Sequence, residues 1–326
     1  MIITRTPHRI SFFGGGSDYP AYFLKHKGCV LSTTIDKYVY VSCRWLPPFF
    51  EHKHRIVWSQ VENINKIDEI RNHNVRECLR FLNVQRGVVI NHDSDIPARS
   101  GMGSSSAFTV GLLNALFHLK GGDLIPNRGL AQLAIHIEQD LIKDNVGSQD
   151  QLACAVGGLN FIHFGTDGQN SVIPVNISQE RKKEFESHLM LVFTGFPRTA
   201  SEIAGTYDFN QESLKFMAIQ AQNAEAILIG KGDINYLGYM FNDAWKYKKS
   251  LSNAISTPYI DFLYDNALKA GAIGGKVLGA GGGGFMLLFC EPEKQLQVKE
   301  ALKGSLFVPF HFEDKGSQVI LNNGNS

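Results

Sequence analysis

The sequence has no excess of charge of either sign, no long apolar run and no secretory signal, and each absence excludes a class of protein. Its 32 basic and 31 acidic side chains leave a formal net charge of +1, which argues against a nucleic-acid-binding protein. Strong apolar runs such as Phe285 to Cys290 are far shorter than the ~20 residues of a membrane-spanning helix. We therefore expect no membrane segment. Because the first residues resemble a strand rather than a signal peptide, we also expect a cytoplasmic protein.

Cysteine is scarce as well. The five cysteines are odd in number, widely spaced and never arranged as a CxxC pair. That pattern is typical neither of a disulfide framework nor of a zinc site. We therefore predict buried thiols at Cys29, Cys43, Cys78, Cys154 and Cys290.

The chain is rich in apolar and aromatic residues, and their patterns predict an α+β protein. Its 326 residues are 44% hydrophobic and 11% aromatic, which is enough for a sizeable core and for two domains. The runs Ile2 to Phe13 and Cys29 to Leu46 are rich in β-branched and aromatic residues, which favours a mostly antiparallel sheet. We place a domain boundary near residue 185, which divides the chain into 1–185 and 186–326.

Shorter patterns predict the remaining elements. Apolar residues at helical spacing predict helices over 64–82, 104–119, 126–143, 212–230, 235–252 and 293–303, with another helix ending at 270. Apolar runs predict strands over 54–59, 86–94, 158–165, 169–177, 189–194, 276–279, 284–291 and 306–312. The last strands and helices together favour a split βαβ sandwich.

The stretch PARSGMGSSSAF, residues 97–108, contains two glycines and four serines around the start of the helix predicted from 104. Glycines let a backbone turn tightly and present N–H groups, and a helix N-terminus attracts anions, so the stretch predicts a phosphate-binding loop. It is not a GxxxxGK[ST] loop, and it lacks the third glycine of a dinucleotide-binding fingerprint. From the residues alone, a serine-rich helix cap is the alternative interpretation.

Two other stretches are equally rich in glycine. TPHRISFFGGGSDYP, residues 6–20, ends a strand in three glycines and a carboxylate, and KVLGAGGGGF, residues 276–285, has five glycines within six positions. Such a density of glycine costs chain entropy and is expected where a backbone or a ligand approaches closely. One glycine-rich loop is common, whereas three separated loops favour a phosphate-binding site.

In order and separation, the three stretches resemble the three motifs of the GHMP kinases, the family of galactokinase, homoserine kinase, mevalonate kinase and phosphomevalonate kinase. The resemblance covers nearly the whole chain. It implies a ribosomal S5-like N-terminal domain and a ferredoxin-like C-terminal domain, with ATP in the cleft between them. The matching residues are Pro7, Arg9, Gly14 and Asp18; Pro97, Gly101, Gly103, Ser104 and Ser105; and Lys276, Gly279, Ala280 and Gly281 to Gly283.

The resemblance also implies ATP and Mg²⁺ as cofactors. In the family, a serine of the second motif and a glutamate on a following helix hold the metal, which indicates Ser105 and Glu138. Without the resemblance, Glu138 would be an ordinary solvated glutamate. The ATP-binding residues that it implies are Pro97, Ser100, Gly101, Met102, Gly103, Ser104, Ser105 and Ser106.

Two catalytic residues follow from the same resemblance. In the family, an aspartate about a dozen residues after the metal-binding glutamate faces the accepting hydroxyl, and a lysine or arginine lies beside it. These residues correspond to Asp150 and Arg9, which would otherwise be an N-cap aspartate and a surface residue of a strand. Phosphoryl transfer needs positioning and charge neutralisation more than a strong base, so we expect Asp150 to orient the hydroxyl and to receive its proton late.

The first stretch carries the information about the substrate. Galactokinases have Glu and His where this sequence has Gly15 and Gly16, whereas PHRISFFGGGSDYP is similar to the group of D-glycero-D-manno-heptose 7-phosphate kinases, with the fucokinase domain next. Both groups phosphorylate an anomeric hydroxyl. The substrate-binding residues that this implies are Asp18, Gly15, Gly16, Gly281 and Gly282, with Arg198 for the sugar phosphate; a surface arginine is the alternative for Arg198.

Other functions of the same fold stay open. The alternatives are a fucokinase- or galactokinase-like enzyme, a sensor that binds sugar and ATP without turnover, and a decarboxylase of a phosphorylated acid. A sensor is expected to lack the aspartate, serine or glutamate, and all three are present, so we expect an ATP-dependent sugar kinase. We expect ATP and a small sugar phosphate as its partners, and a homodimer is compatible with the sequence.

Overall fold

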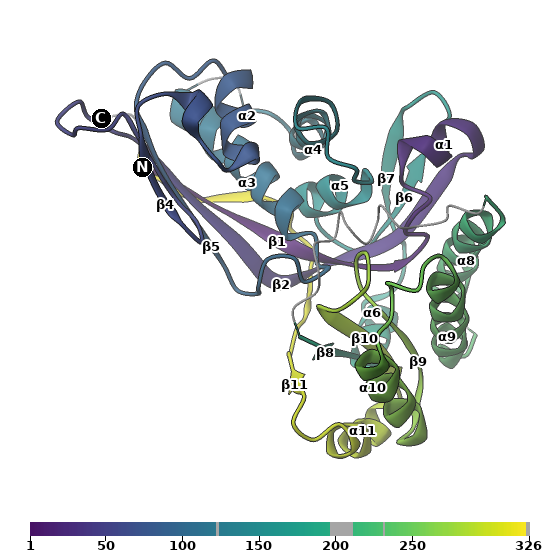
Figure 1. Ribbon diagram of the computed structural model, residues 1–326. Helices are drawn as coiled ribbons and strands as arrows, with labels where there is room; N and C mark the ends of the chain where they lie inside the picture. The colour runs from purple at the N-terminus through teal and green to yellow at the C-terminus, as the bar shows by residue number, and fades with distance from the viewer. Residues whose placement is uncertain (122–123, 196–210, 231, 324–326) are drawn as a thin grey trace.

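Two β-sheets organise the chain (Figure 1). The computed structural model describes residues 1–121, 124–195, 211–230 and 232–323. The larger sheet has nine strands in this part of the chain, and the smaller has four. The path of the larger sheet is β13 (Gln318–Asn322), β1 (Ile2–Phe13), β2 (Gly28–Trp45), β5 (Val88–Ser94), β3 (His54–Val57) and β4 (Val61–Ile64). In addition, β12 (Phe312–Glu313) and β6 (Asn160–Phe164) pair with β2, and β7 (Asn170–Pro174) pairs with β6.

Four helices cover one face of the larger sheet (Figure 1). They are α2 (His73–Phe81), α3 (Ser104–Lys120), α4 (Asn127–Ile135) and α5 (Gln149–Val156). α3 is apolar on nearly all sides, because it is covered by the sheet below it and by its neighbouring helices. Gly111 lets it approach β1, since a Cβ atom at this position would lie 2.8 Å from Thr6 Oγ1.

The smaller sheet has its own helices and packs against the other side of β1. Its strands are β11 (Leu306–Phe307), β8 (Leu189–Phe193), β10 (Phe285–Cys290) and β9 (Ala272–Val277). The helices of this part are α8 (Gln211–Ile229), α9 (Asn235–Ser250), α10 (Pro258–Lys269) and α11 (Gln295–Ala301). The rings of Phe13 and Phe241 stack with centroids 4.4 Å apart, which joins β1 to α9. This shared apolar core brings the loops of the two sheets together.

β1 changes the face that it presents to α3 and α5 part-way along its length. Thr4 Oγ1 donates to Gly111 O of α3, so the first half of the strand directs its even-numbered residues to that face. The pairing of β1 with β2 then shifts between Pro7 and His8. Beyond the shift, the odd-numbered residues Arg9 and Ser11 line the cleft described below. An irregularity in pairing that re-aims side chains next to a functional site is a known use of β-bulges.

Most of the predicted elements are present. The predicted strands over 2–13 and 29–46 and the helix over 104–119 correspond to β1, β2 and α3, and all five cysteines are free and buried as predicted. The helix predicted over 64–82 is wrong in its first half, because 61–64 form β4, 67–69 form a 3₁₀ turn and α2 begins only at His73. Ile64, Ile67 and Ile70 recur every three residues, as on one face of a helix, but they lie at the end of β4, at the start of the 3₁₀ turn and just after this turn.

Several short elements were not predicted. They are α1 (Pro20–His26), α5, α6 (Gln179–Ser187), β4, β12 and β13, and the strand predicted over 306–312 is only the two residues of β11. β12 and β13 return the end of the chain to the larger sheet (Figure 1). No helix in the described part of the chain is both long and apolar enough to span a membrane.

Candidate active site

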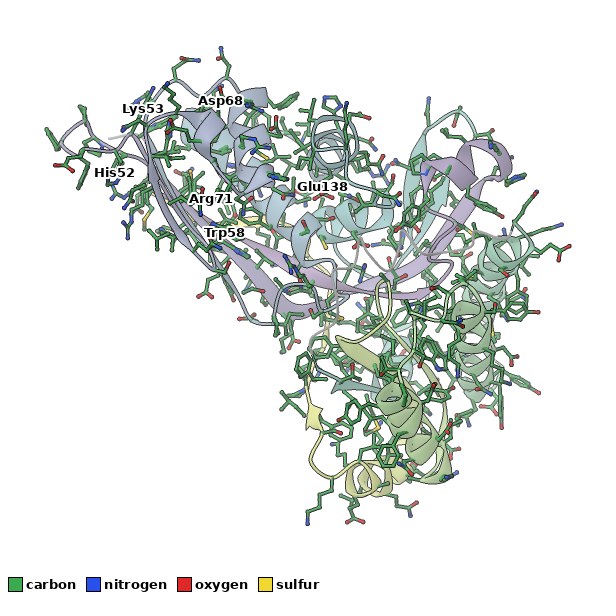
Figure 2. All side chains as sticks on the ribbon, in the orientation of Figure 1. His52, Lys53, Trp58, Asp68, Arg71 and Glu138 are labelled. Carbon is green, nitrogen blue, oxygen red and sulfur yellow. The ribbon has the colours of Figure 1, made fainter. Side chains whose placement is uncertain are left out.

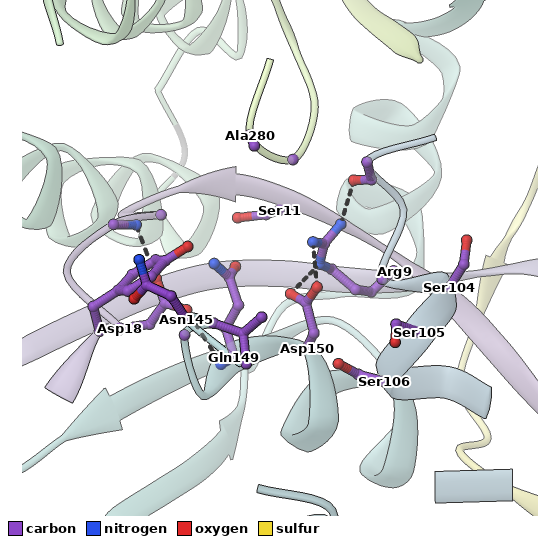
Figure 3. Close-up of a pocket in the computed structure, with 18 of the residues that line it drawn as sticks. Arg9, Ser11, Asp18, Ser104, Ser105, Ser106, Asn145, Gln149, Asp150 and Ala280 are labelled. Carbon is purple, nitrogen blue, oxygen red and sulfur yellow. Dashed lines mark hydrogen bonds and ion pairs between the residues drawn. The ribbon is translucent and has the colours of Figure 1, made fainter. Parts of the chain in front are cut away.

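A cleft lies where the loops of the two sheets meet, and all three glycine-rich stretches contribute to its lining. Figure 3 shows Ser104, Ser105 and Ser106 on one side, Asp18 and Gln149 on the other, and Asp150 between them. We call these two sides the serine end and the Asp18 end of the cleft. Each stretch contributes residues to the lining of the cleft: Gly15 and Gly16 from the first, Ser100, Gly101 and 103–106 from the second, and Gly279 and Ala280 from the third.

At the serine end, α3 begins with backbone N–H groups that no side chain of the described residues caps. The N-cap residue is Gly103, whose φ of 73° is left-handed and which has no side chain that could accept a hydrogen bond from the first turn. Ser104 Oγ and Ser100 Oγ are buried without a hydrogen-bond partner in the described residues. The alternative of a serine-rich cap is therefore excluded. Free N–H groups, unpaired hydroxyls and the helix dipole together suit a phosphate group.

The second and third glycine-rich stretches touch through their backbones. A Cβ atom on Gly101 would lie 2.5 Å from Leu278 O, and one on Gly279 would lie 2.4 Å from Gly101 Cα. Both glycines also have a positive φ, of 80° and 62°. A side chain at either position would clash and strain the backbone, so these two loops depend on glycine for their contact.

Arg9 and Asp150 form a bidentate ion pair in the middle of the cleft (Figure 3). Arg9 Nε lies 2.7 Å from Asp150 Oδ1, Arg9 Nη2 lies 2.7 Å from Oδ2, and Nη1 donates to Gly101 O at 2.7 Å. The Arg9 side chain is 4% exposed and that of Asp150 is 25% exposed. Burial lowers the pKa of Arg9, but the adjacent carboxylate more than offsets this and raises it above its ordinary value. Arg9 is therefore no surface residue, and its partner carboxylate remains open to the cleft.

The structure also excludes the simple capping role for Asp150. The N-cap of α5 is Ser148, and Asp150 is the second residue of the helix, within its first turn. A carboxylate in the first turn of a helix is favoured by the helix dipole. The pairing with Arg9 and the helix start together fix the direction of this carboxylate.

Asp18 is buried at the other end of the cleft. Its carboxylate accepts hydrogen bonds from Gly16 N at 2.8 Å and from Gln149 N at 3.3 Å. Burial and, to a smaller extent, the nearby Asp150 raise the pKa of Asp18 to about 6, although the backbone hydrogen bonds to its carboxylate lower it. Asp18 thus connects the first glycine-rich stretch to the start of α5, and it is also one of the residues that line the cleft.

Glu138 lies in a π-helical turn, η2 (His136–Leu141), which directly continues α4. Figure 2 shows it between α3 and α5. Its side chain is buried and accepts hydrogen bonds from Ser106 Oγ at 2.9 Å, Thr109 Oγ1 at 2.7 Å and Gln151 Nε2. Burial raises the pKa of Glu138 to about 7 despite these bonds, which lower it. The alternative of a solvated glutamate is therefore wrong, and a π-turn at such a position is typical of functional sites.

Not every predicted residue lies in the cleft. Pro97 is exposed, Met102 is buried in the core between the sheets, and neither lines the cleft. Gly281 and Gly282 pack against Ile255 instead, with Gly282 N donating to Ile255 O at 2.8 Å. Ser105 is exposed in the cleft, whereas its neighbour Ser106 is the serine that contacts Glu138. Arg198 lies outside the described residues.

Sequence reasoning missed several residues that line the cleft. Ser11 Oγ and Gln149 Oε1 are buried there without a hydrogen-bond partner in the described residues. Lys248 also lines the cleft, although it belongs to the charged sequence WKYKKS, which is typical of a solvated helix face. Alternation along β1 could have indicated Ser11, but only if the shift after Pro7 were known.

Comparison with known proteins identifies the family. The D-glycero-alpha-D-manno-heptose 7-phosphate kinase of Campylobacter jejuni is 30% identical over an alignment 324 residues long, gaps included, that covers 93% of each chain. The family models for the GHMP kinases N-terminal domain and C-terminal region match residues 70–158 and 224–307. The chain belongs to the GHMP kinases. It is an ATP-dependent sugar kinase, similar to heptose phosphate kinases.

Other members of the GHMP kinase family are similar over the same length or part of it. The crystal structure of a D-glycero-D-manno-heptose 1-phosphate kinase from Bacteroides thetaiotaomicron has a TM-score of 0.80 and 24% identity, covering 99% of this chain and 100% of that one. The bifunctional fucokinase/GDP-fucose pyrophosphorylase of Arabidopsis thaliana is 27% identical over an alignment 228 residues long, gaps included, that covers 67% of this chain and 21% of that protein. The predicted two-part GHMP kinase fold is thus confirmed.

Proposed function

We propose that this kinase transfers the terminal phosphate of ATP to the anomeric hydroxyl of D-glycero-D-manno-heptose 7-phosphate. The product would be the 1,7-bisphosphate, an intermediate in the biosynthesis of nucleotide-activated heptose. The observation that carries the proposal is the Arg9–Asp150 pair, which lies between a serine end suited to phosphate and an Asp18 end lined by polar groups. The name of the relative from Campylobacter jejuni supports the choice of sugar.

The serine end would hold the phosphates of ATP. The backbone N–H groups at the start of α3 are donors whose directions the helix fixes before ATP binds, and the hydroxyls of Ser100 and Ser104 can rotate to donate as well. Donors fixed in advance stabilise developing charge more than mobile water does, because they need no reorganisation during the reaction. Contact between Gly101 and Gly279 keeps this loop in place from the other side of the cleft.

The Asp18 end would hold the sugar. Asp18, Ser11 and Gln149 bring together a carboxylate and two unpaired oxygen atoms, which suit the several hydroxyls of a sugar. A sugar bound there directs a hydroxyl to Asp150, whose carboxylate Arg9 holds in one orientation. Asp150 would orient this hydroxyl toward the terminal phosphate and accept its proton late in the transfer.

Glu138 and Ser105 fit a Mg²⁺ ion that binds together with ATP. Mg²⁺ prefers oxygen ligands and usually combines one or two carboxylates with substrate phosphates and waters. Glu138 is a buried carboxylate beside α3, and Ser105 is an exposed hydroxyl at the serine end. No cluster of three His, Cys, Asp or Glu residues suited to a metal occurs in the described ranges, so phosphate oxygens would complete the site. The bound ion would neutralise charge on the phosphates.

Removing either proposed metal ligand should raise the requirement for Mg²⁺. We expect Glu138→Gln to raise the Mg²⁺ concentration for half-maximal activity by roughly tenfold or more and to lower turnover, with a smaller effect for Ser105→Ala. The measurement is ADP formation against Mg²⁺ at fixed ATP, together with Mn²⁺ binding in the presence of ADP. Asp140→Asn is the control, because this carboxylate is 66% exposed and pairs with His136. Unchanged metal dependence in both variants would remove Glu138 and Ser105 from the metal site.

The function itself is tested by ADP formation across a panel of sugars. We expect Mg²⁺-dependent turnover of D-glycero-D-manno-heptose 7-phosphate, with far lower kcat/KM for unphosphorylated heptose, fucose and galactose. A preference for fucose or galactose would replace the proposed substrate while keeping the reaction. Binding of ATP with no turnover of any sugar would contradict catalysis and favour a sensor.

A further inference from the structure

Two lysine side chains in the cleft are buried without a carboxylate partner among the described residues. Lys248, on α9, and Lys276, on β9, are 6% and 5% exposed, and both line the cleft. No ion pair joins either ammonium group to an acidic residue in the described part of the chain. A buried cation is costly unless an anion or several hydrogen bonds compensate for its lost hydration.

The hydrogen bonds of the two ammonium groups are incomplete. Lys248 Nζ donates to Val277 O at 2.7 Å and to Gly279 O at 2.6 Å, and Lys276 Nζ donates to Phe12 O at 2.6 Å. An ammonium group has three donors, so within the described residues one donor remains on Lys248 and two on Lys276. Through these hydrogen bonds, the two lysines hold the third glycine-rich stretch and the end of β1 next to the cleft that both lysines line.

The two lysines and Arg9 form a group of basic side chains that lie close enough to affect one another's pKa. Burial, with a smaller contribution from Arg9, lowers the pKa of Lys276 to about 7. Burial also lowers the pKa of Lys248, with further contributions from Lys276 and Arg9. Of the three cations, Arg9 has the Asp150 carboxylate as its partner. Within the described residues, two buried amino groups without a carboxylate partner thus lie beside the proposed catalytic pair.

A bound anion would neutralise the charge of the two ammonium groups and accept hydrogen bonds from their remaining N–H donors. We propose that Lys248 and Lys276 form a phosphate subsite, in which the two ammonium groups bind one phosphate of a substrate. The inference rests on the proposed function, because a sugar phosphate and ATP provide the two sources of such a phosphate. The contact of Lys276 with Phe12, three residues before Gly15, favours the phosphate of the sugar, since Gly15 lines the cleft with Asp18.

Kinetics of single variants distinguish the two sources. Lys248→Met and Lys276→Met keep an apolar chain but remove the charge. If the sugar phosphate binds here, each should raise KM for heptose 7-phosphate by roughly 10- to 100-fold, the usual effect of a lost charge-assisted hydrogen bond, and leave kcat/KM for unphosphorylated heptose nearly unchanged. If the terminal phosphate of ATP binds here, kcat/KM should fall equally with both sugars. Lys246→Met is the matched control, because Lys246 lies on the same helix and is 64% exposed.

Binding of inorganic phosphate tests the subsite without turnover. In the presence of saturating ADP, phosphate should raise the Tm of the wild-type protein, and the shift should be lost in both lysine variants and retained in Lys246→Met. If the wild-type enzyme used no sugar phosphate but showed this shift, the subsite would stand and the proposed substrate would fall. Absence of the shift in the wild-type protein would overturn the subsite whether or not the variants fold. Unchanged phosphate binding in variants with a lower free energy of unfolding would leave the lysines a structural role only.

Discussion

Replacing Asp150 by Asn should lower turnover by ~10² or more, while the affinity for ATP changes little. The substitution keeps the size of the side chain but removes its charge and a proton-accepting oxygen. Asp150 lies between the two ends of the cleft, whereas the groups suited to the phosphates of ATP lie at the serine end (Figure 3). The two effects are separated by measuring kcat with saturating sugar and the Kd of a non-hydrolysable ATP analogue.

The interpretation requires that the Asp150→Asn variant be folded. Loss of the carboxylate leaves the guanidinium of Arg9 buried with one partner fewer, so urea unfolding should be measured alongside activity. Asp140→Asn controls for the substitution itself, since its side chain is 66% exposed. Near-normal turnover in folded Asp150→Asn would move the catalytic role to another carboxylate. Asp144 would then be the first to examine, because it lines the cleft, whereas Asp140 does not.

The elements that could be predicted from the sequence are the long ones, in which the pattern of residues within the element itself indicates a strand or a helix. β1 and β2 are long runs of β-branched and aromatic residues, and α3 has a continuous apolar pattern, so each was predicted close to its observed bounds. α5 and β13 were missed because short elements carry little periodicity. β13 is also partly exposed, and only its pairing with β1 makes it a strand. We retain the proposed division near residue 185, with β12 and β13 as a return of the chain to the first part.

For the cleft, sequence motifs indicated the backbone loops better than the side chains around them. Glycines reveal where two loops approach each other, as Gly101 and Gly279 do, because no other residue fits there. Lys248 carries no such signal, since a lysine on a charged helix is usually exposed and only the tertiary packing buries it. The hydrogen bond from Ser106 to Glu138 likewise depends on the π-helical turn that positions Glu138. No pattern in the sequence predicts this turn.

Replacing Arg9 by Met should lower turnover as strongly as Asp150→Asn, by ~10² or more, but it should also weaken ATP binding. The structural reason for the difference is that Arg9 contacts both functional regions. Two of its nitrogens hold Asp150, while Nη1 donates to Gly101 O and the backbone N–H donates to Met102 O at 3.1 Å. Methionine keeps the backbone contact and loses the other three. The serine end should therefore lose part of its support in Arg9→Met and keep it in Asp150→Asn.

The double variant, Arg9→Met with Asp150→Asn, decides whether the two residues act as one unit. Both single variants break the same buried ion pair, so the double variant should lose much less activity than the product of the two single losses. Its free energy of unfolding should also be higher than the two single destabilisations would give by addition, because no uncompensated charge of the pair remains buried. The measurements are kcat/KM and urea unfolding for all four proteins. Losses that simply multiply would show that Arg9 and Asp150 contribute independently, and Arg9 would then be a support of the phosphate loop rather than the partner that orients the catalytic carboxylate.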